Sequence, residues 1–201
     1  MKKILYILVL IVVLACVLIS CNSSDSLEEA TTTIPEETTP QAPEDNFPTS
    51  QGLAYTVNDD GETCTIMGIG TCADSNVYIG GYIDGYKITT IGEYSFLWRD
   101  SLTSVTIGDS VTTIGNYAFW GCKNLASVKI GDSVTTIGMR AFCSASRLTS
   151  VIFTNSIGWC CTRDEPATSD TAISASDLSN PTTAAQYLES DFSWYYWHRT
   201  E

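Results

Sequence analysis

Cysteine side chains can form covalent bonds and bind metals, and the 201-residue chain has eight cysteines but only one histidine. Nucleophilic catalysis needs an oriented base beside the nucleophile. His198 lies three residues before the end of the sequence, so we expect an exposed tail histidine and a chain that is not an enzyme. Zinc sites typically use Cys-x-x-Cys or paired-histidine spacings. The sequence contains neither, so it predicts no metal site and no cofactor.

Two further patterns offer weaker chemistry. Residues 68–73, GIGTCA, have the spacing of a dinucleotide-binding turn, but Asp-Ser-Asn follows where that motif needs a helix. Asp59, Asp60 and Glu62 could suggest a calcium loop, but they lack the twelve-residue spacing of an EF-hand. A tight Asp-Gly turn explains them better, because this dipeptide is typical of β-hairpins.

The first residues predict export. Two lysines precede an apolar run from Ile4 to Ile19, which is typical of a signal peptide, here residues 1–20. The sixteen-residue run is shorter than the roughly 20 residues that cross a bilayer, so a transmembrane anchor is the less favoured alternative. Residues 18–21, LISC, resemble the lipobox of bacterial lipoproteins. This resemblance implies cleavage before Cys21, lipidation of Cys21 and anchoring to a bacterial membrane, at the outer membrane or cell surface.

Residues 21–52 predict an acidic tether. The segment is rich in Thr, Ser, Pro and Glu, and between Asn22 and Ser50 it has seven acidic residues and no basic one. Such a composition cannot bury enough apolar surface to offset chain entropy. The whole chain has a net charge of −13, whereas nucleic-acid binding needs basic patches. We therefore exclude nucleic acid as a partner and expect the tether to hold a domain clear of the membrane.

Six cysteines lie beyond the lipobox, and an exported chain permits disulfides. Cys64 with Cys72 is a candidate bridge across the amino-terminal part of the domain. Cys122 falls at an apolar position of the repeat described below and is expected to be a small buried side chain. Neighbouring Cys160 and Cys161 seldom bond to each other, so one of them is a candidate partner of Cys143.

A 23-residue repeat organises the sequence after the tether. Ile-Gly recurs at positions 91, 114 and 137, and residues 101–115 return as residues 124–138 with twelve of fifteen positions identical. A fixed period of roughly 20 to 29 residues is typical of a leucine-rich solenoid, in which each unit stacks on the next. Within a unit, apolar Val105 and Ile107 flank polar Thr106, which predicts a half-buried strand.

A solenoid of this kind needs caps, because its end units have open apolar faces. Strand patterns on either side of residues 58–62 predict a β-hairpin cap at the start of the repeat domain, residues 53–158. Asn180-Pro181 predicts a short helix that runs to Glu189, and dense aromatic residues follow. We expect residues 159–201 to form a helical and aromatic cap; an aromatic platform for carbohydrate or peptide is the alternative.

Units of the form LTSVTIGDSVTTIGNYAFWGC resemble the BspA-like leucine-rich repeats of bacterial surface proteins. The resemblance covers roughly residues 53–153, where the Ile-Gly, Ala-Phe and Leu-x-x-Val-x-Ile elements fall in register three times. Ser95 replaces the usual alanine, and Arg99 stands where Cys122 does. The ending of the chain is also similar to an extension found with such repeats in some anaerobes and spirochaetes.

This resemblance implies a non-catalytic module that binds or adheres to an extracellular protein or polymer. Thr106, Lys129 and Ile152 are the candidate contacts, because they lie at outward strand positions one period apart and neighbouring strands align them. An ordinary solvated surface is the other explanation of this row. A structural or envelope-maintenance lipoprotein without a host ligand is the alternative function.

Overall fold

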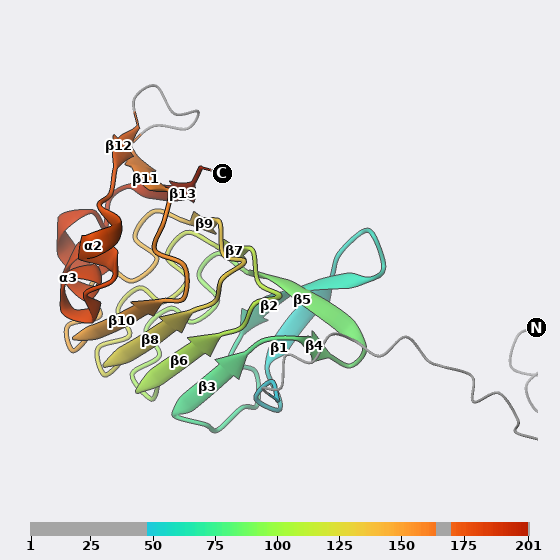
Figure 1. Ribbon diagram of the computed structural model, residues 1–201. Coiled ribbons are helices and arrows are strands. Elements are labelled where there is room, and N and C mark those ends of the chain that lie inside the picture. The colour runs from blue at the N-terminus through green and yellow to red at the C-terminus, as the bar shows by residue number, and fades with distance from the viewer. Residues whose placement is uncertain (1–47, 164–169, 201) are drawn as a thin grey trace, which may run out of the picture. The chain divides into compact units, whose positions relative to one another are not determined.

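The computed structural model describes residues 48–163 and 170–200. The predicted signal peptide, Cys21 and most of the tether lie outside this range. The described residues form a solenoid with two sheets along its length, one of four strands and one of nine (Figure 1). The sequence-based prediction of a leucine-rich solenoid is therefore confirmed. Within the described ranges, no helix has both the length and the apolar character needed to cross a membrane.

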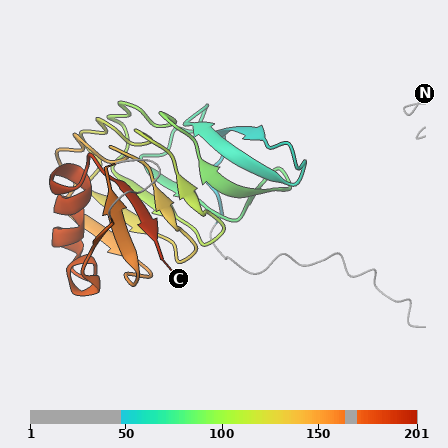
Figure 2. The same ribbon diagram turned by 90° about the horizontal axis from the view of Figure 1, so that it is seen from above.

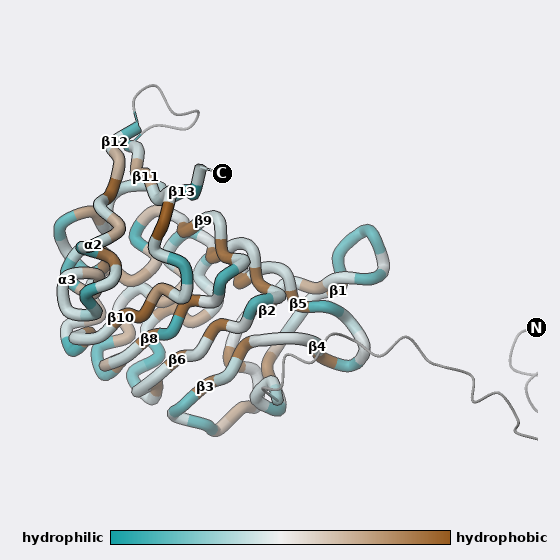
Figure 3. Tube along the Cα trace, in the orientation of Figure 1, coloured by the Kyte–Doolittle hydropathy of each residue, from teal (hydrophilic) through white to brown (hydrophobic). Residues whose placement is uncertain are grey.

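One sheet is parallel, and its last three strands follow one another at the 23-residue period of the repeat. Its strands are β3 (Asn76–Ile79), β6 (Ser104–Ile107), β8 (Ser127–Ile130) and β10 (Ser150–Phe153). They lie in the order β10-β8-β6-β3. In each strand the second and fourth residues are buried, whereas the first and third are exposed or half-buried. The same alternation recurs from turn to turn of the solenoid (Figure 3), so every strand presents one apolar face to the core.

The nine-stranded sheet begins with the predicted hairpin. Strand β1 (Ala54–Val57) pairs antiparallel with β2 (Thr63–Gly68). Parallel strands follow along the solenoid: β5 (Tyr86–Ile91), β7 (Thr113–Ile114) and β9 (Thr136–Ile137). Strand β4 (Tyr82–Ile83) flanks β5 and forms the insertion of the first, divergent unit. Three antiparallel strands complete the sheet: β13 (Tyr196–Arg199), β11 (Trp159–Thr162) and β12 (Thr171–Ala172).

Asp60 closes the hairpin turn with both of its carboxylate oxygens. Oδ1 accepts hydrogen bonds from the backbone N–H groups of Glu62 and Thr63, each 2.9 Å long. Oδ2 accepts the Thr63 hydroxyl at 2.6 Å. These bonds, first among them the one from the Thr63 hydroxyl, lower the pKa of Asp60 from its usual value. The turn thus uses the carboxylate that a calcium loop would need.

The core consists of identical side chains stacked from one unit to the next. The aromatic rings of Phe96, Phe119 and Phe142 are fully buried and nearly parallel, with centroids 5.0 and 5.1 Å apart. A second column contains the isoleucines that precede each repeated glycine, and these are also fully buried. Because each ring contacts its copies above and below, no unit can bury its own core alone.

The glycine of each Ile-Gly pair is required by the close approach of neighbouring turns. The N–H of Gly115 donates to Ile91 O at 2.8 Å, and that of Gly138 donates to Ile114 O at the same distance. A Cβ added at Gly115 would lie 2.7 Å from Glu93 N and 2.8 Å from Gly92 C. Such contacts with backbone atoms would push adjacent units apart. Each repeated Ile-Gly pair therefore marks a buried core position, the isoleucine, and a position without room for a side chain, the glycine.

The carboxyl-terminal residues form the predicted cap. It contains α2 (Ala175–Leu178), α3 (Pro181–Gln186) and a π-helical turn, η1 (Tyr187–Asp191). Asn180 caps α3 as expected, accepting the N–H groups of Thr182 and Thr183 at 3.0 and 3.2 Å. The predicted helix changes to π-helical hydrogen bonding at Tyr187, which is half-buried. The helical segment lies beside β10 at the end of the solenoid, as two orthogonal views show (Figures 1 and 2).

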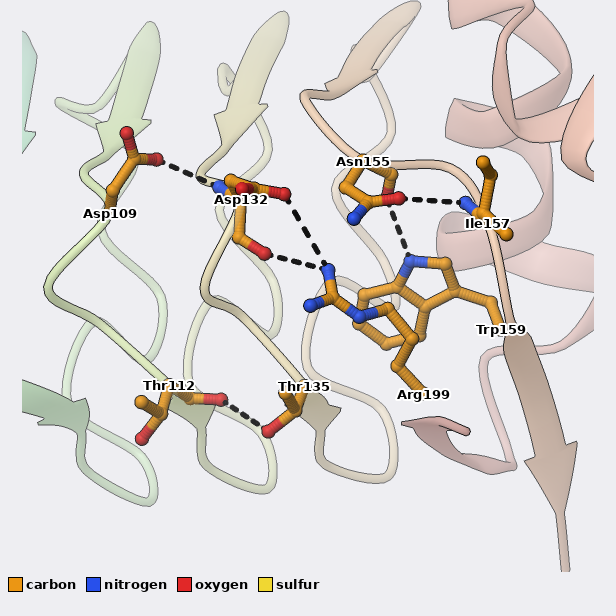
Figure 4. A network of polar contacts seen from close by, with 8 residues as sticks. All are labelled: Asp109, Thr112, Asp132, Thr135, Asn155, Ile157, Trp159 and Arg199. Carbon is orange, nitrogen blue, oxygen red and sulfur yellow. Dashed lines mark hydrogen bonds and ion pairs between the residues drawn. The ribbon is translucent and has the colours of Figure 1, made fainter. Parts of the chain in front are cut away.

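Strand β13 attaches the cap to the last complete unit. Its backbone pairs antiparallel with β9, and Arg199 extends over the preceding turn (Figure 4). Arg199 Nη1 donates to Asp132 O at 2.6 Å and lies 3.9 Å from the carboxylate Oδ1 of the same residue. Asp109, one period earlier, accepts the backbone N–H of Asp132 at 2.8 Å. The repeat thus supplies a series of equivalent turns, and the cap binds the last of them.

At the other end, the folded part begins before residue 53. Thr49 and Ser50, which the sequence analysis assigned to the tether, are buried. The N–H of Ser50 donates to Tyr78 O at 2.9 Å, and the Ser50 hydroxyl accepts the Tyr78 N–H at 3.1 Å. The predicted boundary is corrected accordingly: Ser50 hydrogen-bonds to the outer edge of β3 and Thr49 to Gly80 just after it, which a composition argument does not detect.

All six described cysteines are free thiols. Cys122 is a buried core residue, as expected, and its burial raises the pKa of the thiol to about 11. Cys64, a residue of β2, is buried, and Cys72 is half-buried. They are not joined in this structure, and a bridge between them stays a prediction, as does one from Cys143.

Candidate binding surface

The predicted row of outward strand residues, Thr106, Lys129 and Ile152, is present and is longer than expected; we call it the strand-face row. Thr106 pairs with Lys129 on one side, and Lys129 pairs with Ile152. On its other side Thr106 pairs with Tyr78, which the sequence analysis missed because the first unit contains an insertion. Tyr78, Lys129 and Ile152 are exposed, and Thr106 is half-buried. The structure therefore aligns an aromatic, a hydroxyl, a cationic and an aliphatic side chain across four strands.

A second surface lies on the turns that follow the Ile-Gly pairs. We call Tyr94, Trp98, Tyr117 and Trp120 the aromatic strip. The rings of Tyr94 and Tyr117 stack at 5.0 Å with 13° between their planes, and those of Trp98 and Trp120 lie 5.6 Å apart. Tyr117 and Trp120 also make an edge contact at 5.8 Å, which joins the two pairs. Tyr94 and Trp98 are 48% and 63% exposed, whereas Tyr117 and Trp120 are half-buried, so the first two present the apolar surface of the strip to solvent.

Arg140 and the cap extend this surface. Arg140 occupies the position one period after Tyr117, and its guanidinium carbon lies 5.7 Å from the Tyr117 ring centroid. The same carbon lies 3.1 Å from the ring centroid of Trp194, which is 58% exposed. A cation over an aromatic face is attracted by the ring quadrupole. Arg140 thus connects the aromatic strip with an exposed tryptophan of the cap.

The backbone under these side chains has a conformation that suits smaller residues. Tyr94, Tyr117 and Arg140 have φ of 57°, 55° and 57°. This left-handed region costs a residue with a Cβ roughly 1–2 kcal/mol, and glycine or asparagine would adopt it more easily. Core packing does not require a large exposed ring there. We conclude that the turn geometry alone does not explain the aromatic side chains.

The sequence analysis did not identify these turns as a binding surface. A signal was present, because Tyr94 and Tyr117 are one period apart. Trp98 and Trp120 are 22 residues apart and therefore do not align by the period. They meet because the Trp98 indole lies over Gly121, where a side chain would collide with it. The pairing of the tryptophans could only be found from the fold.

The two sheets, the 23-residue turns and their shared core define a leucine-rich repeat protein. Residues 84–163 match the family model described as a BspA type leucine rich repeat region, in six copies. Residues 84–163 are therefore a repeat region of the BspA-type leucine-rich repeat family, as their motifs suggested. No curated protein matches the chain significantly.

Solved structures of bacterial repeat proteins are similar to this chain. A leucine-rich repeat protein of Treponema pallidum has a TM-score of 0.50 and 26% identity over 54% of this chain and 50% of its own. One from Bacteroides capillosus has 30% identity over 49% of this chain and 75% of its own, with a TM-score of 0.46. A leucine-rich cell surface protein from Faecalibacterium prausnitzii has 31% identity over 53% and 31%, with a TM-score of 0.41. The chain spans about half the length of the Treponema protein.

Proposed function

We propose that this chain is a non-catalytic binding module, exported and lipid-anchored through Cys21, that binds an extracellular protein or polymer with its aromatic strip. The observation that carries the proposal is the exposure of Tyr94 and Trp98 on turns where smaller residues would be less strained. Tryptophan and tyrosine dominate binding energy at interfaces because they bury large apolar areas with little loss of side-chain entropy. A partner that places rings or flat apolar groups on the strip would gain this energy.

The charge of the chain narrows the class of partner. With a net charge of −13, the protein repels polyanions. Arg140 is engaged with Trp194 and Tyr117, so this cation supports the aromatic surface and does not form an isolated basic patch. A neutral or basic protein or polymer fits this surface best.

Replacing Trp98 and Trp120 together by alanine should weaken binding roughly thirtyfold, about 2 kcal/mol, because tryptophans of this kind are frequent hot spots. The measurement is affinity of a soluble form without residues 1–21 for partners captured from extracellular proteins and cell-wall polymers. Thr106→Ala with Lys129→Ala is the matched control on the strand face and should bind as the parent does. Loss of binding in the control alone would contradict the aromatic strip as the binding site and show that the partner contacts the strand-face row.

The lipid anchor is tested separately. Cys21→Ser should remove the lipid mass and release the protein from the membrane fraction, because the Cys21 sulfur is the atom that would carry the lipid and the apolar run alone is too short to anchor stably. Mass spectrometry and membrane fractionation give the result. Cys16→Ser, in the same apolar segment, is the control and should keep the lipid. A Cys21→Ser protein that stays membrane-bound at full length would contradict the anchor.

A further inference from the structure

Three residues with metal-binding side chains meet on the outer face of the cap sheet. Cys160 of β11 lies directly opposite His198 of β13, so their side chains share one face of the sheet. Asp170 immediately precedes β12, which pairs with the other edge of β11. One thiol, one imidazole nitrogen and one carboxylate oxygen of these residues all lie within 4.8 Å of one another. The cluster unites residues 38 positions apart in the sequence and was invisible to spacing rules for metal sites.

The distances suit a tetrahedral ion. His198 Nε2 and Asp170 Oδ2 are 3.3 Å apart. Ligands about 2.0–2.1 Å from a tetrahedral zinc are separated by about 3.3 Å, so this pair already has the required spacing. A zinc–sulfur bond of about 2.3 Å places a thiolate about 3.6 Å from the other ligands. Because the Cys160 sulfur lies within 4.8 Å of the other two ligand atoms, it needs to move by at most about 1.2 Å, which a half-buried side chain achieves by a small rotation.

The alternatives within the cluster are less suitable. The neighbouring thiol of Cys161 is buried on the opposite face of β11, so only Cys160 is directed to this site. His198 and Asp170 also form an ion pair when the imidazole is protonated, but their side chains are 31% and 41% exposed. Exposed pairs of this kind contribute about 1 kcal/mol or less. An ion pair leaves the adjacent thiol without a role, whereas a metal uses all three groups.

We propose that Cys160, Asp170 and His198 bind one zinc ion, with water at the fourth position. Sulfur, imidazole and carboxylate are the ligand types that zinc takes in proteins. The ion would link β11, β13 and the residue just before β12. These three segments belong to the cap, where β11 pairs with both β12 and β13. Because the ligands converge only when the cap is folded, zinc binding stabilises the folded cap. The proposal is independent of the aromatic strip and of any partner bound there.

The test is titration of the reduced protein with zinc, and with cobalt as a spectroscopic probe. We expect one equivalent to bind, thiolate-to-cobalt charge-transfer absorption, and a higher unfolding temperature with zinc. Cys160→Ser should abolish the charge-transfer band, and His198→Gln should weaken zinc binding more than tenfold. Cys143→Ser removes a half-buried thiol outside the cluster and is the matched control, with unchanged binding.

Two results would overturn the zinc site. One is the absence of stoichiometric binding in the folded parent protein, and the other is binding that Cys160→Ser and His198→Gln leave unchanged. Circular dichroism of each variant shows whether the cap has folded. If either of these variants unfolds, Asp170→Asn provides the test at an exposed ligand, and it should weaken zinc binding more than tenfold while the far-ultraviolet spectrum stays that of the parent.

Discussion

Phe119→Ala should lower the free energy of unfolding by about 3–5 kcal/mol, the cost of replacing a fully buried phenylalanine by alanine. Phe119 is the middle ring of the core column, with parallel neighbours 5.0 Å away at Phe96 and 5.1 Å away at Phe142. Its removal leaves a cavity between two units and deprives both outer rings of a contact. Because each unit depends on its neighbours, we expect unfolding of the whole array and not of one turn.

Denaturant unfolding of the soluble form provides the measurement for Phe119→Ala. Trp98→Ala is the control, since it also removes a large aromatic ring from the repeat, but one that is 63% exposed. The control should cost no more than about 1 kcal/mol, from the lost contact with Trp120. Equal losses in the two variants would show that the phenylalanine column does not hold the units together.

The repeated part of this fold is predictable because its information is local. A strand that alternates as Val105, Thr106 and Ile107 do fixes which face is buried, and the constant 23-residue period fixes the register with the next strand. Asn180-Pro181 likewise encodes the start of α3 within four residues. In each case the side chains that specify the structure are adjacent in the sequence to the backbone that they specify.

The unpredicted features depend on contacts between distant segments. Nothing near His198 indicates that β13 inserts between β9 and β11, yet that pairing removes the histidine from the expected exposed tail and places it beside Asp170. Ser50 is another example, because its partner Tyr78 is 28 residues away. The aromatic strip was missed for a different reason: outward residues carry no packing constraint, and the period aligns Tyr94 with Tyr117 but does not align Trp98 with Trp120.

The last strand edges of the two sheets are covered by different elements of the cap, and this arrangement determines which residue of the cap is most sensitive to substitution. The outer edge of β9 is covered by β13, an added antiparallel strand, whereas the helical segment lies beside β10. Both devices protect strand edges that would otherwise pair with other chains. Trp197 of β13, which is 1% exposed, packs against both sheets: its ring centroid is 6.2 Å from that of Phe153 of β10 and 6.3 Å from that of Trp159 of β11.

Trp197→Ala should therefore destabilise the cap by about 3–5 kcal/mol, the usual cost of removing a buried tryptophan. The variant also loses the hydrogen bond from the indole N–H to Phe192 O, which is 3.1 Å long. Hydrogen exchange should become faster at the amides of β11 and β13, and less so in β6, two units away.

Trp194→Ala is the matched control three residues earlier, because that ring is 58% exposed and contacts mainly the Arg140 guanidinium. We expect the control to cost about 0.5–1 kcal/mol, the range for an exposed cation–π contact. If the amides of Trp197→Ala exchanged hydrogen as slowly as those of this control, the buried aromatic residues would not be what holds the cap on the end of the solenoid.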